Sequence, residues 1–594
     1  MASPTTVATG AIHEEFVRRA TETPDAVALT HGPTSTTYAE LNAASDHLAE
    51  RLRSAGVTTE SPVGLLSYRS ARMLTGLLAV FKAGATAILL DPGHPQARLR
   101  EVVDSIAPAL VLTDPDVEFS HVRSVPLTYE SSNAPVGVPV PLDCLAYLVL
   151  TSGSTGAPKP VAVTHRSIAD ATRIHREGYR LSARDRGSWL SPPGSSVSVG
   201  ELWPFLSVGA SVHVADQDVV SSPEALRDWL VAQRITVAYA GMPLAEALYT
   251  LPWPADCALR LLVVGSDTVR TWASTSLPFE VAVSIGSAEA NAISSCLSPW
   301  GRRITSKTAS RARQTTLPPV GRAWPGVRTH VLDGEFNPLP VGTIGELHVA
   351  SSQLARGYLG DPRRTAAAFV PNPYAPGERL YRTGDLVRLG ADGVLEHCGR
   401  VDGQVKIDGQ RVVPAEVERH LLAHPDVTEA VVVARQDPSG RQRLVAYLAG
   451  GEVPAATMRG FVAGRLPVPS VPTAYVHLDT LPRNVNGKID RRSLPDPRWQ
   501  PDAPVDSQRD PQRGDGDEID RAVVDSWRSA LKLDRVAEDD DFYLVGGDSM
   551  AGNKIARDLN RRFGLRLTVR AVLLRPTPRQ LAAAVRSAIG RRDA

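Results

Sequence analysis

This chain has few cysteines, few lysines and no long apolar run. Its four cysteines, Cys144, Cys257, Cys296 and Cys398, are widely spaced and form neither a CxxC pair nor a dense disulfide framework. That pattern argues against a zinc cluster and suits a reducing cytoplasm. Arginine is the usual base, because lysine occurs only at positions 82, 159, 307, 406, 488, 532 and 554. A lysine inside a motif is therefore unlikely to be there by chance.

The chain is also nearly neutral and shows no targeting segment. Its 65 basic and 64 acidic residues leave a formal net charge of +1, so no overall field draws it to nucleic acid or to an anionic membrane. The N-terminus, MASPTTVATGAIHEEF, has no basic start followed by an apolar core. The most apolar stretches, such as 145–150 and 261–264, are far shorter than a membrane span. We expect a cytoplasmic protein that binds neither nucleic acid nor membrane.

The length and the residue patterns predict two or three domains. Short β-rich runs alternate with helical segments from about residue 10 to 300, which predicts βαβ units around largely parallel sheets. Short strands with Gly/Pro turns follow over 320–400, and a second small α/β unit follows from about 403 to 495. The segment 495–516 is rich in Pro, Asp and Arg and is typical of a linker. Apolar residues at four-residue steps then predict a small helical bundle over 517–594.

A Gly/Ser/Thr loop follows LAYLVL, a predicted strand. Glycines let backbone N–H groups turn toward an anion, hydroxyls add donors, and a lysine adds positive charge. The candidate phosphate-binding residues are Thr151, Ser152, Gly153, Ser154, Thr155, Gly156 and Lys159. An ordinary polar turn accounts for this loop equally well when it is taken alone. Its glycine spacing and its ending exclude the Walker pattern.

Seven motifs stand in order along the chain. They are TYAEL (37–41), FKAGATAILLD (81–91), LAYLVLTSGSTGAPKP (145–160), GELHVASSQLARGYLG (345–360), YRTGDL (381–386), GRVDGQVKIDGQRVVPAEVE (399–418) and NVNGKIDR (484–491). With them the chain resembles the adenylation domains of nonribosomal peptide synthetases, within the acyl-adenylate-forming superfamily. The resemblance implies an α/β fold, with a large subdomain of mostly parallel sheets over 1–401 and a small α+β subdomain over 402–494. ATP and Mg²⁺ would bind between the two subdomains.

The resemblance also implies roles for single residues around the ribose. Asp385 would bind the ribose hydroxyls, because a carboxylate can accept two hydrogen bonds. Arg400 would lie near the same sugar, and His397 stands where the family has an aromatic residue facing the ribose. Asp402 would be the hinge about which the small subdomain rotates between half-reactions.

The segment 283–289 corresponds to a family motif that contacts adenine, phosphate and metal. Glu289 would be the Mg²⁺ ligand, since Mg²⁺ prefers hard oxygen donors. Gly286 and Ser287 would lie beside the nucleotide. Two positions depart from the family, because Ile285 replaces a stacking Tyr and Ala288 replaces a phosphate-binding Thr. We expect the Ser287 hydroxyl to substitute for the missing Thr.

Lys488 is the expected catalytic residue. In this family the matching lysine, which follows Asn-Gly, stabilises charge as the carboxylate attacks the α-phosphate. A preorganised cation in a water-poor cleft contributes on the order of 10²–10³ in rate.

The segment FYLVGGDSM (542–550) resembles the attachment motif of peptidyl carrier proteins. Gly546 and Gly547 form a tight turn, Asp548 is a good N-cap, and Ser549 opens a predicted helix. A helix N-terminus favours the phosphodiester that would join 4′-phosphopantetheine to Ser549. The resemblance implies an all-α, four-helix carrier domain over 517–594, with the thiol of the arm as the nucleophile.

The resemblance places the acid-binding pocket between residues 196 and 293. The pocket positions are Ser196, Val197, Gly200, Leu244, Leu262, Val264, Ser284, Ala292 and Ile293. Ser196 stands where the family has an Asp that pairs with the α-ammonium of the substrate. Since none of these residues is ionised, and burying an unpaired ammonium is costly, we expect an aryl, hydroxy, keto or atypical amino acid.

The motifs together favour a self-loading adenylation–carrier module, either an initiation or a stand-alone one. The alternatives are a standard amino-acid-activating module, an acyl-CoA ligase, and a degenerate adenylation domain that serves as carrier or scaffold. The tethered carrier segment argues against the ligase, and the retained Lys159, Glu289, Asp385, Arg400 and Lys488 argue against degeneracy. Such a module needs a phosphopantetheinyl transferase and a downstream condensation, synthetase or tailoring enzyme. The sequence leaves open which acid is used and whether a small helper protein takes part.

Overall fold

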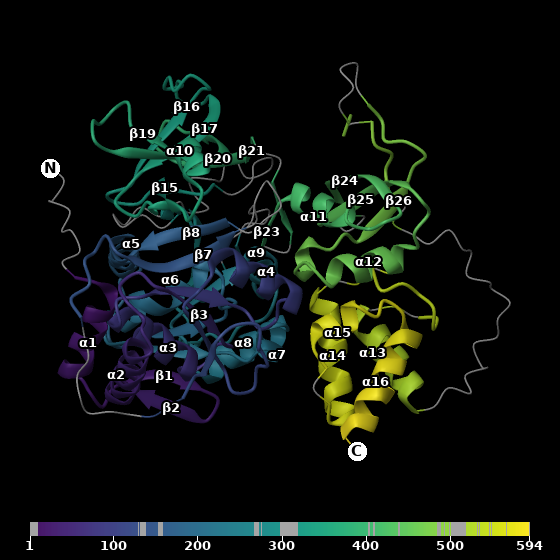
Figure 1. Cartoon of the computed structure of the whole chain (residues 1–594), viewed down its shortest axis with the longest axis horizontal. Helices are drawn as coiled ribbons and strands as arrows, with labels where there is room; N and C mark the ends of the chain where they lie inside the picture. Colours follow the sequence, from purple (N-terminus) through teal and green to yellow (C-terminus); the bar gives the residue numbers. More distant parts are fainter. Residues whose placement is uncertain are drawn as a thin grey trace.

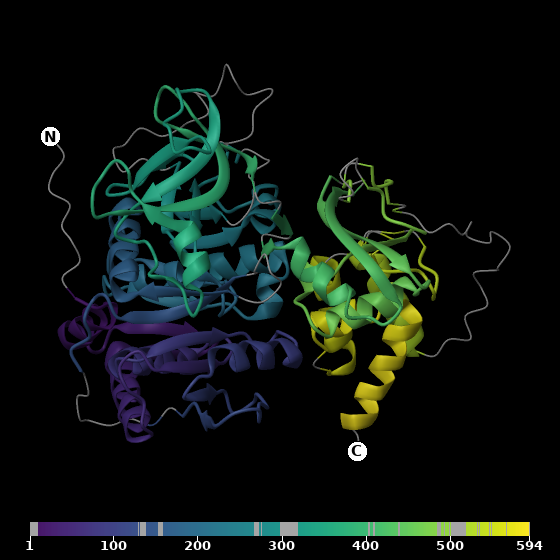
Figure 2. The same ribbon diagram turned by 45° about the horizontal axis from the view of Figure 1, so that its top comes forward.

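In the computed structural model the chain forms three bodies (Figures 1 and 2). A large subdomain lies beside a small subdomain and a C-terminal bundle, and the small subdomain and the bundle contact each other. The described residues are 10–128, 130, 138–151, 159–265, 273–274, 276–296, 319–401, 404–407, 410–437, 440–483, 489–491, 493–497, 499, 518–531, 533, 535–543, 545, 547, 549–565 and 567–592.

The large subdomain contains a seven-stranded sheet whose central strands are parallel. Its order is β18 (Gly357–Tyr358), β8 (Lys159–Thr164), β7 (Leu145–Thr151), β4 (Thr86–Leu90), β3 (Pro62–Leu66), β5 (Leu110–Thr113) and β6 (Ser124–Pro126). Successive strand residues face opposite sides. Leu65 therefore packs in the same core as α3 (Ala71–Lys82), whereas Leu66 packs with α4 (Gln96–Ile106). The antiparallel β7–β8 pair brings Thr151 opposite Lys159 and so fixes both ends of the Gly/Ser/Thr loop.

The TYAEL motif has a structural role at the start of α2 (Tyr38–Ser54). The Thr37 hydroxyl accepts a hydrogen bond from the Glu40 N–H at 3.2 Å, and the Glu40 carboxylate accepts one from the Thr37 N–H at 2.8 Å. This reciprocal capping box satisfies two donors that the first helical turn would otherwise leave unpaired.

The second sheet of the large subdomain has nine strands. Its order is β15 (Arg322–Ala323), β14 (Asn291–Ser295), β13 (Glu280–Ser287), β12 (Leu261–Gly265), β11 (Val237–Gly241), β9 (Arg186–Trp189), β10 (Ser211–Val214), β1 (Val27–His31) and β2 (Thr34–Thr37), and the strands from β13 to β1 are parallel. The helices that follow or precede these strands are α1 (Ile12–Glu22), α5 (His165–Gly178), α6 (Ser196–Leu206), α7 (Gln217–Val220), α8 (Pro223–Ala232) and α9 (Met242–Tyr249). Helices α5 and α6 share the main core, and α8 and α9 pack in a second one.

An antiparallel sheet completes the large subdomain. It contains β16 (Arg328–Leu332), β17 (Ile344–Ala350), β20 (Arg379–Leu389) and β19 (Phe369–Pro371), with β21 (Leu395–Arg400) paired to β20, and α10 (Pro362–Ala368) precedes β19. The β20–β21 register sets Asp385 directly opposite Arg400.

The small subdomain has a three-stranded sheet covered by two helices. Its elements are the hairpin β22 (Val405–Ile407) and β23 (Gln410–Val412), α11 (Pro414–Leu421), β24 (Val427–Gln436), β25 (Gln442–Gly450), α12 (Ala455–Ala463), the 3₁₀ turn η1 (Val468–Ser470) and β26 (Ala474–His477). The hairpin faces the large subdomain, and α12 faces the C-terminal bundle (Figure 1).

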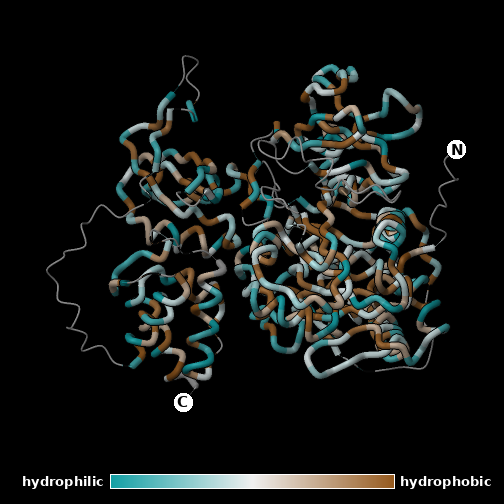
Figure 3. Tube along the Cα trace, turned by 180° about the vertical axis from the view of Figure 1, so that it is seen from behind, coloured by the Kyte–Doolittle hydropathy of each residue, from teal (hydrophilic) through white to brown (hydrophobic). Residues whose placement is uncertain are grey.

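The C-terminal bundle consists of α13 (Glu518–Leu531), α14 (Ser549–Phe563), α15 (Val569–Leu573) and α16 (Pro578–Arg592) in the described part of the chain. Val523 and Trp527 of α13 and Ile555 and Leu559 of α14 fill its core, as their four-residue spacing predicts. Hydrophobic and hydrophilic residues alternate along its helices (Figure 3). The predicted fold class, a two-part α/β protein followed by a small helical domain, is confirmed.

Candidate nucleotide and acid site

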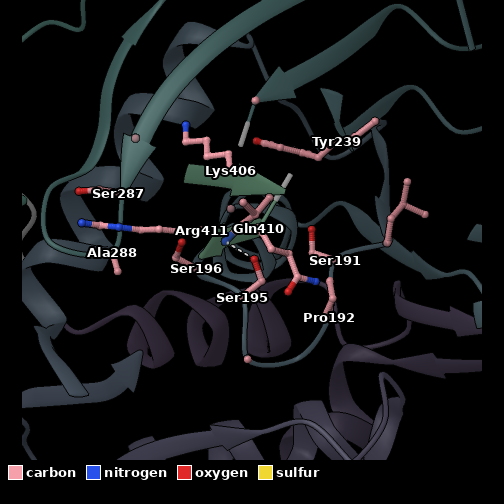
Figure 4. A pocket seen from close by; sticks show the side chains of 18 of the residues that line it. Ser191, Pro192, Ser195, Ser196, Tyr239, Ser287, Ala288, Lys406, Gln410 and Arg411 are labelled. Carbon is pink, nitrogen blue, oxygen red and sulfur yellow. Dashed lines mark hydrogen bonds between the residues drawn. The ribbon is translucent and has the colours of Figure 1, made fainter. Parts of the chain in front are cut away.

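A cavity of about 960 Å³ lies where the three bodies meet. Gly241, Gly265 and Ser287, which end strands β11, β12 and β13, stand on its wall. Ligands of α/β proteins commonly bind beyond the carboxyl ends of parallel strands and between domains. Figure 4 shows Lys406 and Arg411 of the small subdomain at the same pocket as Ser196 and Ser287 of the large one.

Asp385 and Arg400 form a charged pair on the cavity wall. The Arg400 guanidinium donates to Asp385 Oδ1 at 2.5 Å, and His397 Nε2 lies 3.5 Å from the same oxygen. Burial favours the neutral carboxyl, but contact with His397 and the charges of Arg400 and Lys406 outweigh it and lower the pKa of Asp385. Asp385 is therefore an ionised acceptor, which is the chemistry that a pair of ribose hydroxyls requires. The three residues predicted around the ribose lie together.

Glu289 is fully buried, and its two carboxylate oxygens differ in their contacts. Oε1 accepts a hydrogen bond from the Tyr358 hydroxyl at 3.0 Å and lies 3.7 Å from the Arg411 guanidinium. Oε2 is buried and has no hydrogen-bond partner among the described residues. Lys159 Nζ lies 5.6 Å from the centre of the Tyr358 ring. Tyr358 thus links the predicted metal ligand to the predicted phosphate-binding lysine.

The Oε2 atom of Glu289 fits one bond to Mg²⁺. No group of three or more His, Cys, Asp or Glu side chains that could hold a metal occurs in the described part of the chain. Mg²⁺ commonly uses one or two carboxylates and takes its other ligands from phosphates and water. Glu289 would hold the ion, and the ion would neutralise negative charge on the phosphates of bound ATP.

The β22–β23 hairpin brings two cations into the cavity. Lys406 and Arg411 are paired across the hairpin, and both line the same cavity as Asp385 and Arg400. The Arg411 guanidinium also donates to the Gln404 side chain. Neither cation was predicted as a site residue from the sequence. The available signal for Lys406 was its place inside a motif, because lysine is rare in this chain.

Seven of the nine predicted acid-pocket residues line the cavity. They are Ser196, Val197, Gly200, Leu244, Val264, Ser284 and Ala292. The prediction is corrected for Leu262 and Ile293, which are buried in apolar cores and do not line it. Leu262 lies two residues further from the carboxyl end of β12 than Val264, and Ile293 faces the side of β14 opposite to Ala292.

The acid pocket has an aromatic wall that was not predicted from the sequence. His175, Tyr179 and Tyr239 line the cavity, with ring centres 5.2 to 6.4 Å apart. A Cβ at Gly200 would lie 3.5 Å from His175 and 3.8 Å from Tyr239, so the missing side chain opens the way to these rings. Burial lowers the pKa of His175 to about 4 and raises the pKa of both tyrosines. The wall is therefore uncharged at neutral pH.

The start of α6 forms the uncharged side of the pocket. The Ser195 hydroxyl caps the helix by accepting a hydrogen bond from the Val197 N–H at 3.2 Å, and Ser196 begins the helix. Both serines line the cavity.

The C-terminal bundle also reaches the cavity. Asn553 of α14 lines it, together with Pro467 and Ser470 of the small subdomain. Ser549 is the first residue of α14, as predicted, and lies about one helical turn before Asn553. The predicted residues Ser152, Gly153, Ser154, Thr155, Gly156, Asp402 and Lys488 and the Ser549 side chain lie outside the described part of the structure.

Three protein-family models match consecutive parts of the chain. They are AMP-binding enzyme over residues 16–359, AMP-binding enzyme C-terminal domain over 416–488, and phosphopantetheine attachment site over 521–585. The chain therefore belongs to the AMP-binding enzyme family, and its C-terminal bundle (518–592) is a carrier domain. Such domains imply ATP, Mg²⁺ and a covalently attached phosphopantetheine as cofactors.

Several of the similar proteins are peptide synthetases, and one similar solved structure is an o-succinylbenzoate CoA synthetase from Bacillus subtilis, at 23% identity over 81% of this chain and a TM-score of 0.70. A linear gramicidin synthase from Brevibacillus parabrevis is 36% identical over 96% of this chain, and phosphinothricin tripeptide synthetase PhsC from Streptomyces viridochromogenes is 34% identical over 95%. The chain spans 11% and 52% of these two relatives. A solved structure of a synthetase protein containing adenylation and PCP domains covers 98% of this chain, and this chain covers 98% of it, at 24% identity and a TM-score of 0.75. None of the described helices is long and apolar enough to cross a membrane.

Proposed function

We propose that this chain uses ATP to activate a carboxylic acid as an acyl-adenylate and transfers the acyl group to its own carrier domain. It would act as a loading or stand-alone module in nonribosomal peptide biosynthesis. The observation that carries this proposal is a cavity lined by residues of all three bodies. One cavity extends from Asp385 through the acid pocket at Ser284 to Asn553, one turn beyond Ser549.

In the first half-reaction an oxygen of the acid forms a bond to the α-phosphorus of ATP, and diphosphate leaves. Asp385 and Arg400 would hold the ribose end, and Glu289 would hold Mg²⁺. Lys488 stabilises the charge that develops at the phosphorus. In the second half-reaction the sulfur of the thiol forms a bond to the acyl carbon, the bond between that carbon and the phosphate oxygen breaks, AMP leaves, and the thiol proton is released to solvent. The phosphopantetheine arm on Ser549 supplies the accepting thiol when it is attached.

We further propose that the acid lacks an ordinary α-ammonium group. Ser195 and Ser196 provide no negative charge where an ammonium would lie, and the N-terminus of α6 carries a partial positive charge. The aromatic wall behind Gly200 is neutral, which supports an aryl or other planar acid.

ATP–diphosphate exchange with a panel of acids tests these statements. We expect exchange with aryl, hydroxy or keto acids and little with common L-amino acids. Exchange with a common L-amino acid alone would contradict the substrate proposal, and no exchange with any acid would favour a degenerate scaffold.

Mass spectrometry after treatment with a phosphopantetheinyl transferase tests the carrier. The wild-type chain should gain one phosphopantetheine and then one acyl group, and Ser549→Ala should gain neither while it keeps the exchange reaction. The same mass gain in Ser549→Ala would place the arm elsewhere. Acyl transfer to free coenzyme A in Ser549→Ala would favour the acyl-CoA ligase. Phosphopantetheinyl transferase and a downstream synthetase enzyme are the proposed partners.

A further inference from the structure

Arg459 is buried at the junction of the small subdomain and the carrier domain. Its side chain is only 3% exposed, which is rare for arginine unless the charge is paired. One guanidinium nitrogen donates to Asp541 Oδ2 of the carrier domain at 2.9 Å. The other donates to the Thr473 carbonyl of the small subdomain at 3.1 Å. The guanidinium therefore bridges the two bodies.

The same guanidinium lies over two aromatic rings. Its central carbon is 4.4 Å from the ring centre of Tyr543 in the carrier domain and 5.9 Å from that of Tyr475 in the small subdomain. The attraction between a cation and an aromatic face is stronger when the cation is desolvated than when it is exposed to water. Thr473 and Tyr475 belong to the body that carries Arg459, so they orient the side chain whether or not the carrier domain is docked.

The partner segment, Asp541–Tyr543, is tied firmly to the carrier core. Asp541 Oδ1 accepts from the Tyr543 N–H at 2.9 Å, and the Tyr543 hydroxyl donates to the Leu573 carbonyl at 3.1 Å. Phe542 is fully buried against Trp527, with ring centres 5.2 Å apart. The Gly547 N–H donates to the Phe542 carbonyl at 2.7 Å, two residues before Ser549. The segment that carries Asp541 is therefore hydrogen-bonded to Gly547, close to the start of α14.

Apolar contacts surround this polar centre. Val468 of the small subdomain packs against the carrier core, and Leu574 of the carrier domain packs against the core of the small subdomain. Pro467 and Ser470, on either side of this contact, line the cavity together with Asn553. The Arg459 contact thus lies beside the place where α14 reaches the cavity.

We infer that Arg459 is the docking residue with which the small subdomain recognises an acidic–aromatic segment of the carrier domain. It acts as a positioning residue for acyl transfer: it holds the start of α14 at the cavity and takes no part in adenylate formation. The partner that fits this surface is a carrier domain with a carboxylate at the position of Asp541 and an aromatic ring at that of Tyr543. This inference rests on the proposed function.

The test separates the two half-reactions in the full-length chain. The variants are Arg459→Ala, Asp541→Asn and the double variant, all carrying phosphopantetheine. The matched control is Arg465→Ala, because Arg465 follows the same helix and lies over Phe461 within the small subdomain. Asp541→Asn keeps an acceptor for the Tyr543 N–H, so it protects the fold of the carrier domain while it removes the charge.

We expect ATP–diphosphate exchange within about twofold of wild type in all variants. Single-turnover loading of the arm should slow at least tenfold in each single variant, and the double variant should be no slower than the slower single one, because the two residues share one interaction. Arg465→Ala should load like wild type.

Three results would overturn the inference. Unchanged loading in Arg459→Ala and Asp541→Asn would remove the docking role. Equal losses of exchange and loading would show that Arg459 only maintains the small subdomain. Additive losses in the double variant would show that the two residues act separately. A wild-type chain that neither exchanges nor loads would instead contradict the proposed function, and the inference would fall with it.

Discussion

At the scale of single residues, a hydrogen bond from Tyr358 orients the Glu289 carboxylate. Its hydroxyl donates to Oε1, and Oε2 has no hydrogen-bond partner among the described side chains. A buried carboxylate that loses its donor pays the desolvation cost of the group without compensation, about 1–3 kcal/mol or more for a charge. The carboxylate predicted to bind Mg²⁺ therefore depends on a phenol from the GELHVASSQLARGYLG motif.

Tyr358→Phe should leave Glu289 less firmly held and so weaken its bond to Mg²⁺. We expect a higher Mg²⁺ concentration for half-maximal ATP–diphosphate exchange and a rate about tenfold lower, in line with one lost charge-assisted hydrogen bond. Tyr374→Phe is the control, since Tyr374 is exposed and its hydroxyl donates to the Phe336 carbonyl and not to Glu289. An unchanged Mg²⁺ dependence would contradict the role of Tyr358.

Lys488→Ala should abolish most adenylate formation and leave the fold intact. One preorganised cation contributes on the order of 10²–10³ in rate. Exchange kinetics measure the loss, and circular dichroism with thermal unfolding checks the fold. Near-normal exchange would remove the catalytic assignment.

At the scale of elements, helices α4 and α11 hold the small subdomain against the large one. Arg98 lies 2.6 Å from Glu416 Oε1, and both side chains are buried. Glu101 accepts from Arg98 at 3.0 Å and from Arg419 at 3.1 Å. Burial raises the pKa of Glu416 even beside Arg98. This arrangement also places the β22–β23 hairpin in the cavity.

Arg98→Ala should destabilise this arrangement of the subdomains. It leaves the Glu416 carboxylate buried without its partner, and breaking a buried pair in this way costs about 3–5 kcal/mol. Small-angle scattering should detect a more open average shape, and arm loading should fall more than exchange. Arg100→Ala, an exposed position on the same helix, should change neither. Identical scattering for both variants would contradict the prediction.

At the scale of the whole molecule, buried neutral histidines make the large subdomain sensitive to acid. Burial lowers the pKa of His13 to about 3 and of His165, His175 and His213 to about 4. Below the unfolded pKa of about 6.5 the unfolded chain binds more protons than the folded chain. The contribution of these neutral histidines to the free energy of unfolding is therefore fully present above pH 6.5. It is lost as the pH falls toward 4, and the loss is roughly 3 kcal/mol for His165.

The melting temperature should accordingly fall between pH 6.5 and 5. His165→Leu should show a smaller fall than wild type, because it removes one group that must charge on unfolding. Thermal unfolding across this pH range measures the difference, and an equal fall in His165→Leu would contradict the explanation.

The sequence predicts the fold and the nucleotide-binding residues better than it predicts the residues that line the acid pocket. Those residues come together only through tertiary packing. Asp385 and Arg400 are found together because both stand in motifs that pair across β20 and β21. The period of a strand gives the face of a residue but not its depth, so Val264 lines the cavity and Leu262 does not. Tyr358, His175 and Arg459 come from separate elements and meet other site residues only through tertiary packing, which no single segment encodes.

The shared cavity has a consequence for engineering. An acceptor thiol carried on the same chain has an effective concentration set by its tether, and a tethered acceptor commonly outcompetes a free one by orders of magnitude. A transplanted carrier domain would keep the tether but lose this advantage if its docking surface did not match Arg459. Retaining the residues at 541 and 543 is therefore the first requirement for a productive exchange of carrier domains.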